Sequence, residues 1–193
     1  MPSRPSPVAE LLADLRRALD ALAVPWYLFG AQAAILHGAA RLTADVDVTV
    51  DLGSRPTTAL VSALTEAGFV LRDADAAFVE TTRVLPLVHT RTRMPTDVVL
   101  AGPGLEALFF ARVEERSIGD VTVPVASAED IVTMKVLAGR AKDLDDAVAV
   151  LRARGATLDL GRTRETLRLL EAALDRRDLV SELERVLAQV RRP

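Results

Sequence analysis

Two acidic residues, Asp45 and Asp47, alternate with valines in a segment that continues to Asp51. This alternation is typical of a β-strand with one apolar and one acidic face, so the two carboxylates share a face about 7 Å apart along the strand. Carboxylates at this spacing can hold Mg²⁺ while phosphate oxygens complete its ligand shell. Alternatively, the aspartates are only the solvent face of an antiparallel strand. Against this, Asp is a poor strand former, and like charges on one face repel each other.

Gly30 ends a short apolar run, residues 26–29, and an Ala-rich segment, residues 31–36, follows it. The pattern predicts a strand, a turn and a helix whose first backbone N–H groups can bind phosphate oxygens. Phosphoryl transfer needs both a metal site and a phosphate site, because its catalysis is mostly positioning and charge neutralisation. The sequence therefore predicts a phosphoryl-transfer site near Gly30 and the acidic strand.

Asp97 is the only charged residue in the apolar, strand-like segment 96–100. A lone carboxylate in such a strand is costly unless it is paired or bound to a metal. We therefore expect Asp97 to complete a three-carboxylate cluster with the acidic strand. A position on an edge strand, or at the start of a strand, is the alternative.

Lysine is rare in this chain, since 22 of the 24 basic residues are Arg. The two exceptions, Lys135 and Lys142, lie seven positions apart, which favours a role for a compact ammonium group that Arg cannot fill. We expect Lys142 to face phosphate, oriented by Asp146 on the exposed face of a helix. Lys135 is a charge inside an apolar helix, which favours a functional role. A solvent-facing Lys135, and a simple ion pair between Lys142 and Asp146, are the alternatives.

Hydrophobic periodicity divides the chain into a mixed part and a helical part. The expected helices span residues 8–23, 31–36, 56–67, 105–111, 127–139, 142–154, 162–174 and 178–191. The expected strands span residues 26–29, 45–51, 69–71, 77–81, 84–89, 96–100, 113–118 and 121–125. We therefore expect an α+β fold, with a mixed β-sheet flanked by helices in residues 1–126 and a helical C-terminal region in residues 127–193.

The order of these motifs resembles the AbiEii/MenT-type nucleotidyltransferase toxins of the DNA polymerase β-like nucleotidyltransferase superfamily. The resemblance covers residues 24–152, and its most specific element is Arg140-x-Lys142-Asp143-x-x-Asp146. The matching residues, in order, are Gly30, Ala31, Arg41, Thr43, Asp45, Asp47, Asp97, Lys135, Arg140, Lys142, Asp143 and Asp146. Ala31 departs from the family, which usually has Ser there, and so lacks a hydroxyl expected to touch a nucleotide phosphate.

The resemblance implies a role for each of these residues. Asp45, Asp47 and Asp97 would bind Mg²⁺ or Mn²⁺, and Asp97 would deprotonate the acceptor hydroxyl. The catalytic residues would be Asp45, Asp47, Asp97, Lys135 and Asp143. The nucleotide-binding residues would be Gly30, Ala31, Arg41, Thr43, Lys135, Arg140, Lys142 and Asp146. The implied reaction moves a nucleoside monophosphate from an NTP to the 3′ end of tRNA and releases pyrophosphate, and the implied protein partner is a cognate antitoxin.

The amino-acid composition excludes several kinds of site and several classes of protein. The chain of 193 residues has no Cys, which excludes disulfides, thiolate zinc sites and a cysteine nucleophile. No apolar run approaches the length of a membrane span, so we expect a cytoplasmic protein without membrane contact. A net charge of −3 is too acidic for a protein that coats duplex nucleic acid. A protein with net negative charge attracts polycations, so nucleotidyl transfer to a small molecule such as an aminoglycoside is one alternative function. A catalytically decayed binding module is another.

Overall fold

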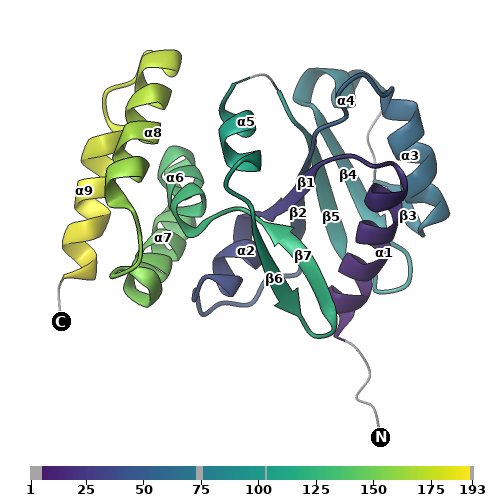
Figure 1. Cartoon of the computed structure of the whole chain (residues 1–193), viewed down its shortest axis with the longest axis horizontal. Helices are drawn as coiled ribbons and strands as arrows, with labels where there is room; N and C mark the ends of the chain where they lie inside the picture. Colours follow the sequence, from purple (N-terminus) through teal and green to yellow (C-terminus); the bar gives the residue numbers. More distant parts are fainter. Residues whose placement is uncertain (1–5, 73–75, 103, 192–193) are drawn as a thin grey trace, which may run out of the picture. The chain divides into compact units, whose positions relative to one another are not determined.

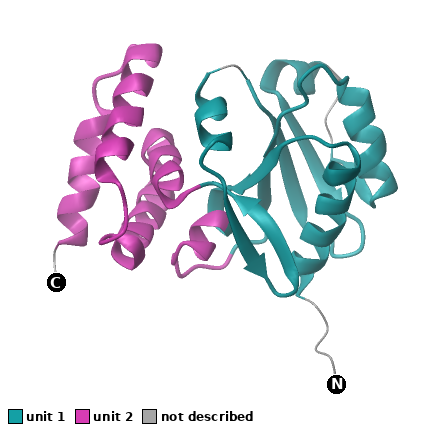
Figure 2. Ribbon diagram, in the orientation of Figure 1, with its two compact units in different colours: residues 1–32, 43–126 teal, residues 33–42, 127–193 magenta. Residues whose placement is uncertain are grey.

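The computed structural model describes residues 6–72, 76–102 and 104–191. The fold combines a mixed β-sheet with flanking helices, as expected (Figure 1). The chain divides into two compact units, which are described separately (Figure 2). Unit 1 comprises residues 1–32 and 43–126, and unit 2 comprises residues 33–42 and 127–193. Among the described residues, no helix combines the length and the apolar character needed to span a bilayer.

Unit 1 contains a seven-stranded sheet with the order β3-β4-β5-β2-β1-β7-β6. The strands are β1 (Trp26–Phe29), β2 (Val46–Val50), β3 (Phe69–Leu71), β4 (Val84–His89), β5 (Pro95–Leu100), β6 (Glu114–Ile118) and β7 (Val121–Val125). The sheet is mixed, because β2 runs parallel to β5 but antiparallel to β1. The acidic strand, β2, therefore lies inside the sheet between β5 and β1. The strand that carries Asp97, β5, also lies inside the sheet, between β4 and β2.

The helices of unit 1 include α1, which covers the sheet with an apolar face. The helices are α1 (Pro7–Ala21), α3 (Thr57–Glu66), α4 (Ala76–Thr82) and α5 (Leu105–Phe110), and the boundary between the units passes through α2 (Gly30–Leu36). Ser6 caps α1 by accepting a hydrogen bond from the backbone N–H of Ala9. The leucines of α1 at helical spacing are fully buried, and the helix packs on α3 and β7. This burial stabilises the layer that supports β2.

One expected strand is wrong, because residues 77–81 belong to helix α4. The β-branched and aromatic residues of this segment favour a strand locally. However, β3 pairs directly with β4, from Phe69↔His89 to Leu71↔Leu87, so the segment that joins them has no place between them. Its backbone groups are satisfied within the helix instead, where the N–H of Arg83 donates to the carbonyl of Val79 at 2.8 Å.

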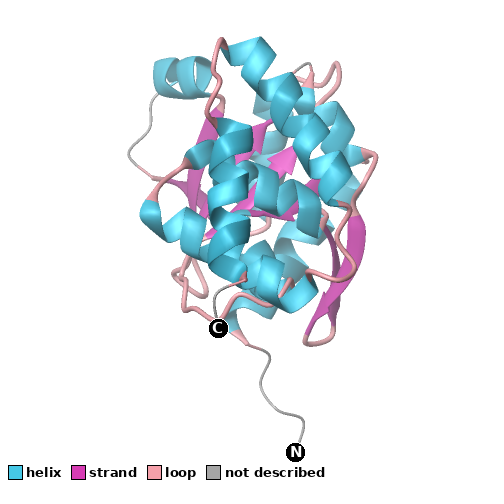
Figure 3. Cartoon of the chain, turned by 90° about the vertical axis from the view of Figure 1, so that its left-hand side faces the viewer, coloured by secondary structure: helices cyan, strands magenta, loops and turns pink. Residues whose placement is uncertain are grey.

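The described part of unit 2 consists of helices and their connections (Figure 3). After Ser127 the helices are α6 (Ala128–Ala138), α7 (Ala141–Arg154), α8 (Leu160–Leu174) and α9 (Leu179–Val190). Ser127 caps α6, since its Oγ accepts from the N–H of Asp130 at 3.2 Å. Gly139 ends α6 in the left-handed conformation, with φ of 64°. This turn leads directly from Lys135 to the motif that begins at Arg140.

A buried polar cluster joins α1 to the turn after β4. His89 is 1% exposed, and its Nε2 lies 3.1 Å from Oδ2 of Asp14, which is also buried. The other ring nitrogen of His89 lies 2.9 Å from the hydroxyl of Thr92. Arg17 and Arg91 also pair with the carboxylate of Asp14. Asp14 is therefore the common acceptor of the cluster.

Replacing Asp14 with Ala should destabilise the protein, because it leaves the Nε2 of His89 buried without its acceptor. We expect a loss of about 1–3 kcal/mol in the free energy of unfolding, measured by urea denaturation. Asp20→Ala is the matched control, since Asp20 forms an exposed pair with Arg16 on the same helix and should cost less than about 1 kcal/mol. Equal losses for the two variants would contradict this assignment.

Candidate active site

The pairing of β2 with β5 places Asp47 directly beside Asp97. The two residues are register partners on parallel strands, whose backbones lie about 4.8 Å apart. Val46 and Val48, their neighbours along β2, are fully buried on the opposite face of the sheet. The two carboxylates therefore share one face, although 50 positions separate them in the sequence.

Asp45 lies one residue before β2 and is exposed. Its backbone N–H donates to the hydroxyl of Thr43 at 3.3 Å. The side-chain amide of Gln32 in turn donates to the carbonyl of Thr43 at 3.4 Å, which ties this loop to α2. The loop thus delivers Asp45 to the same end of β2 as Asp47, while the proposed roles of Asp45 and Thr43 stay predictions.

Arg72 pairs with Asp97, a contact that the sequence did not indicate. One of its terminal nitrogens donates to Oδ1 of Asp97, and the two side chains are 40% and 41% exposed. A pair this exposed contributes little stability, so another cation can compete with it. Arg72 shows that this position beside Asp47 attracts positive charge.

The carboxylates suit a magnesium ion by their chemistry. The expected three-carboxylate cluster is not formed, because among the described residues no three His, Cys, Asp or Glu side chains are grouped so that they could hold a metal ion together. Mg²⁺ commonly needs only one or two protein carboxylates, because water and phosphate oxygens supply its other ligands. Asp47, with Asp45 before it on the chain and Asp97 beside it, offers such a set of oxygens.

Gly30 allows the carboxylate of Asp47 to lie against the backbone at the start of α2. Its φ is +68°, and a Cβ placed there would overlap Oδ2 of Asp47 and lie 2.8 Å from Cγ of the same residue. The expected strand, turn and helix are present, with β1 ending at Phe29 and α2 beginning at Gly30. Ala31, the next residue, is 9% exposed. A phosphate bound here would meet the negative charge of Asp47, so phosphate binding at this turn requires a cation between them.

Unit 2 brings the motif residues into one buried ionic cluster. The ammonium of Lys135 lies 2.8 Å from Asp143 and 2.7 Å from Asp146, and all three side chains are buried. Arg140 pairs with Asp143, and Arg41 pairs with Asp146 at 2.9 Å. The solvent-facing alternative for Lys135 is therefore wrong.

The expected face of α7 is wrong for Asp146. This residue is 4% exposed and pairs with Lys135 and Arg41, whereas Lys142 lies on the surface. The local apolar pattern predicted Asp146 on the exposed face, but α6 supplies a buried cation that the pattern of α7 alone does not contain. Lys142 is thus not held by Asp146, and its contact with a nucleotide stays a prediction.

The cluster changes the acidity of Asp143. Burial opposes the charged form of this carboxyl, but hydrogen bonds and positive charges from Arg140 and Lys135 outweigh it, so the pKa of Asp143 is lowered. The group is therefore ionised in the folded protein at neutral pH. Its ion pairs connect the end of α6 to α7.

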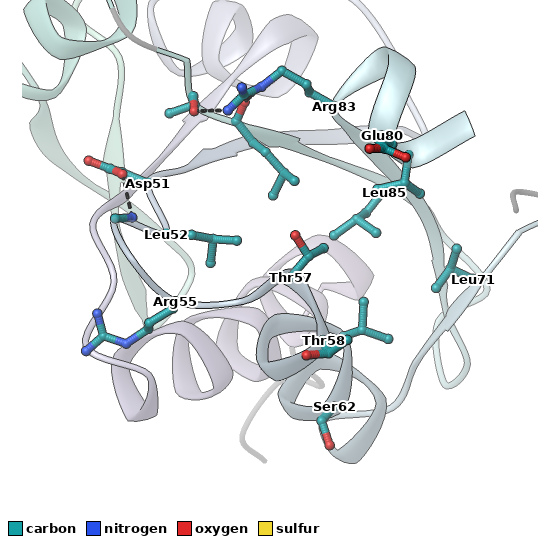
Figure 4. A pocket seen from close by; sticks show the side chains of 15 residues that line it. Asp51, Leu52, Arg55, Thr57, Thr58, Ser62, Leu71, Glu80, Arg83 and Leu85 are labelled. Carbon is teal, nitrogen blue, oxygen red and sulfur yellow. Dashed lines mark hydrogen bonds between the residues drawn. The ribbon is translucent and has the colours of Figure 1, made fainter. Parts of the chain in front are cut away.

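A separate cavity of about 870 Å³ lies in unit 1, between α3, α4 and the ends of β2 and β5 (Figure 4). Leu85 and Leu100 line it, on the face of the sheet opposite Asp97, since Leu85 is the register partner of Val98. Thr57 from α3 contributes a hydroxyl, while Arg83 turns its guanidinium to the carbonyls of Leu100 and Ala101. None of the residues predicted for catalysis lines this cavity.

The fold is shared with proteins of known structure. No protein-family profile matches the sequence, and no curated protein sequence matches it. Three solved structures are similar over most of the chain. The antibiotic-resistance factor ANT(2'')-Ia has a TM-score of 0.62 and 17% identity, covering 89% of this chain and 97% of that chain. A nucleotidyltransferase-like protein from Paracoccidioides brasiliensis has a TM-score of 0.57 and 18% identity, covering 93% and 94%. The lincosamide antibiotic adenylyltransferase LnuA, solved with lincomycin bound, has a TM-score of 0.51 and 16% identity, covering 73% and 94%.

The chain has the nucleotidyltransferase fold. At these levels of identity the likeness concerns the fold alone. The nucleotidyltransferase fold accounts for the mixed sheet, and it gives Asp47 and Asp97 their adjacent positions inside it. What the site does must be argued from its side chains.

Gly30→Ala should displace the carboxylate of Asp47 as well as strain the backbone. Gly53→Ala is the matched control, because Gly53 has a φ of +54° but nothing within 4 Å of an added Cβ. Both changes carry the backbone strain of a left-handed residue, about 1–3 kcal/mol. We expect Gly30→Ala to cost more unfolding free energy and to weaken Mg²⁺ binding in calorimetric titration, with no such weakening in Gly53→Ala. Identical behaviour of the two variants would show that Gly30 is only a turn residue.

The lowered pKa of Asp143 predicts a dependence of stability on pH. A carboxyl whose pKa is lower in the folded than in the unfolded state stabilises the fold above its unfolded pKa, and the contribution disappears as pH falls through the folded pKa. The loss therefore begins as pH falls through the ordinary range of an Asp carboxyl and is complete only below the lowered pKa of Asp143. We expect Asp143→Asn to reduce the unfolding free energy at neutral pH and to flatten its decrease in acid. Parallel pH profiles for Asp143→Asn and the parent protein would count against this assignment.

Proposed function

We propose that this protein is a Mg²⁺-dependent nucleotidyltransferase that transfers a nucleoside monophosphate from an NTP to a hydroxyl acceptor and releases pyrophosphate. The observation that carries the proposal is the register of Asp47 and Asp97 on adjacent parallel strands of a nucleotidyltransferase fold. Two carboxylates side by side at the surface of a sheet favour a cation beside them, as the pairing of Arg72 with Asp97 illustrates. A metal–nucleotide complex would bring a divalent cation to the same face.

In this reaction, different residues of unit 1 would bind the metal ion and accept the proton. Asp45 and Asp47 would hold Mg²⁺, which neutralises the triphosphate and polarises the α-phosphorus when it is bound. Asp97 would accept the proton of the acceptor hydroxyl while the hydroxyl oxygen forms its bond to the α-phosphorus. The bond from that phosphorus to the bridging oxygen would then break, and pyrophosphate would leave. Arg72 would orient the carboxylate of Asp97.

The acceptor that we propose first is RNA, at the tRNA 3′ end, within a toxin–antitoxin system of the AbiEii/MenT type. This choice rests on the order of the motifs, and above all on the Arg140-x-Lys142-Asp143-x-x-Asp146 element. The side chains of Asp143 and Asp146 in that element meet at the Lys135 ammonium, which supports treating the element and the preceding lysine as one unit. A cognate antitoxin is the expected protein partner.

The activity can be tested with labelled nucleotides. The protein should label RNA when it is incubated with Mg²⁺, total RNA and each of the four NTPs in turn. Asp45→Ala and Asp47→Asn should lower the rate by about 100-fold or more, because each removes charge that stabilises the transition state. Asp51→Asn is the control, since Asp51 lies just after the same strand and is exposed, and an Asn keeps the oxygen that accepts from Gly53. Unlabelled RNA with all four NTPs would contradict the RNA assignment.

A small hydroxylated molecule is the second candidate acceptor. The similarity to LnuA and to ANT(2'')-Ia, which has also been crystallised with adenylyl-2''-tobramycin, favours it. Expression should then protect cells against an aminoglycoside or a lincosamide without arresting growth, and the purified protein should label the drug instead of RNA. Growth arrest on expression, reversed by Asp47→Asn, would select the RNA acceptor.

A further inference from the structure

The ammonium of Lys135 is enclosed by two carboxylates. It lies within 2.8 Å of both Asp143 and Asp146, whose side chains are 1% and 5% exposed, and its own side chain is 9% exposed. An ammonium has three N–H donors, and the carboxylates of Asp143 and Asp146 accept from it on its buried side. To reach a phosphate, Lys135 would have to give up two short ion pairs inside a buried cluster, which is unfavourable.

Each carboxylate also holds an arginine nearer to the surface. Asp143 pairs with Arg140, whose side chain is 65% exposed, and Asp146 pairs with Arg41, whose side chain is 30% exposed. The two guanidinium groups therefore lie nearer to the surface than the ammonium, and each is paired with a buried carboxylate. A guanidinium has five N–H donors in a planar fork that matches phosphate oxygens, so it can bind a carboxylate and a phosphate together.

We propose that Lys135 is a positioning residue and not a phosphate ligand: it neutralises Asp143 and Asp146, which in turn hold Arg140 and Arg41 in place to bind the polyphosphate of the nucleotide. This inference rests on the proposed nucleotidyl transfer and assigns its phosphate contacts. The Lys at position 135 then has a physical role, because its compact ammonium contacts two buried carboxylates at once.

The decisive experiment compares Lys135→Met with the charge-balanced double variant Lys135→Met/Asp146→Asn. Binding of inorganic tripolyphosphate and of Mg²⁺·ATP to the full chain is measured by titration calorimetry, and folding is followed by thermal denaturation. Lys135→Met removes the ammonium that both buried carboxylates contact and leaves an excess of buried negative charge, so we expect a lower Tm and about 10-fold or greater loss of affinity. The double variant removes one positive and one negative charge, and the amide oxygen introduced by Asp146→Asn can still accept from Arg41. It should recover both Tm and affinity to within about 3-fold of the parent.

A second comparison keeps the proposal testable if the double variant does not fold. Arg140→Gln should lower tripolyphosphate affinity about 10-fold with little change in Tm, because the guanidinium is exposed and would contact phosphate directly. Arg185→Gln is the matched control, since Arg185 is 67% exposed and pairs with Glu182 three residues away, as Arg140 pairs with Asp143. It should leave the affinity unchanged.

The outcomes separate this inference from the proposed function. A folded double variant that stays about 10-fold weaker than the parent would show that the ammonium itself binds phosphate, and would overturn the positioning role alone. An Arg140→Gln variant that binds as well as Arg185→Gln would also overturn it. A parent protein that binds neither probe would instead contradict the nucleotidyl transfer on which the inference rests.

Discussion

The parallel pairing of β2 with β5 is the constraint on which the candidate site depends. It fixes Asp47 and Asp97 as neighbours on one face of the sheet, with buried valines holding the other face. Side-chain direction alternates along a strand, so a shift of β2 by one residue would turn Asp47 into the apolar layer. Burial of the valines therefore sets the position of the acids. The cost of keeping two like charges together makes the site a place for a cation, which Arg72 supplies here in part.

Unit 2 also holds two carboxylates close together, those of Asp143 and Asp146. There the cation is part of the chain, because Lys135 from α6 enters between two acids of α7. Its position depends on the sharp turn at Gly139, which reverses the chain between the two helices.

The likeness to other structures and the side-chain chemistry contribute different things. Proteins of 16–18% identity share the fold, and two of them carry names that refer to antibiotics. A shared fold at this distance does not carry the acceptor with it, because acceptors are selected by side chains and loops placed on the fold. In the proposed function, the carboxylates and the ionic cluster would serve the nucleotide. The acceptor is decided by the labelling and growth experiments.

The sequence by itself determined the local structure. Alternating valines defined β2, Gly30 marked the turn into α2, and Ser127 and Gly139 bounded α6. These features depend on neighbours a few positions apart, which a linear pattern contains. The same reasoning failed for residues 77–81, because the direct pairing of β3 with β4 overrode their local preference for a strand.

Only the tertiary structure decided which charged groups meet. Asp97 and Asp47 become neighbours through strand register, Arg72 reaches Asp97 from the end of β3, and Asp146 turns inward to Lys135 instead of outward to Lys142. The apolar stripe of α7 could not show this, since an acid belongs on the buried face only when another helix brings a cation there. Charge pairing over long sequence distances depends on how elements pack, and packing is fixed by the whole core and not by any one segment.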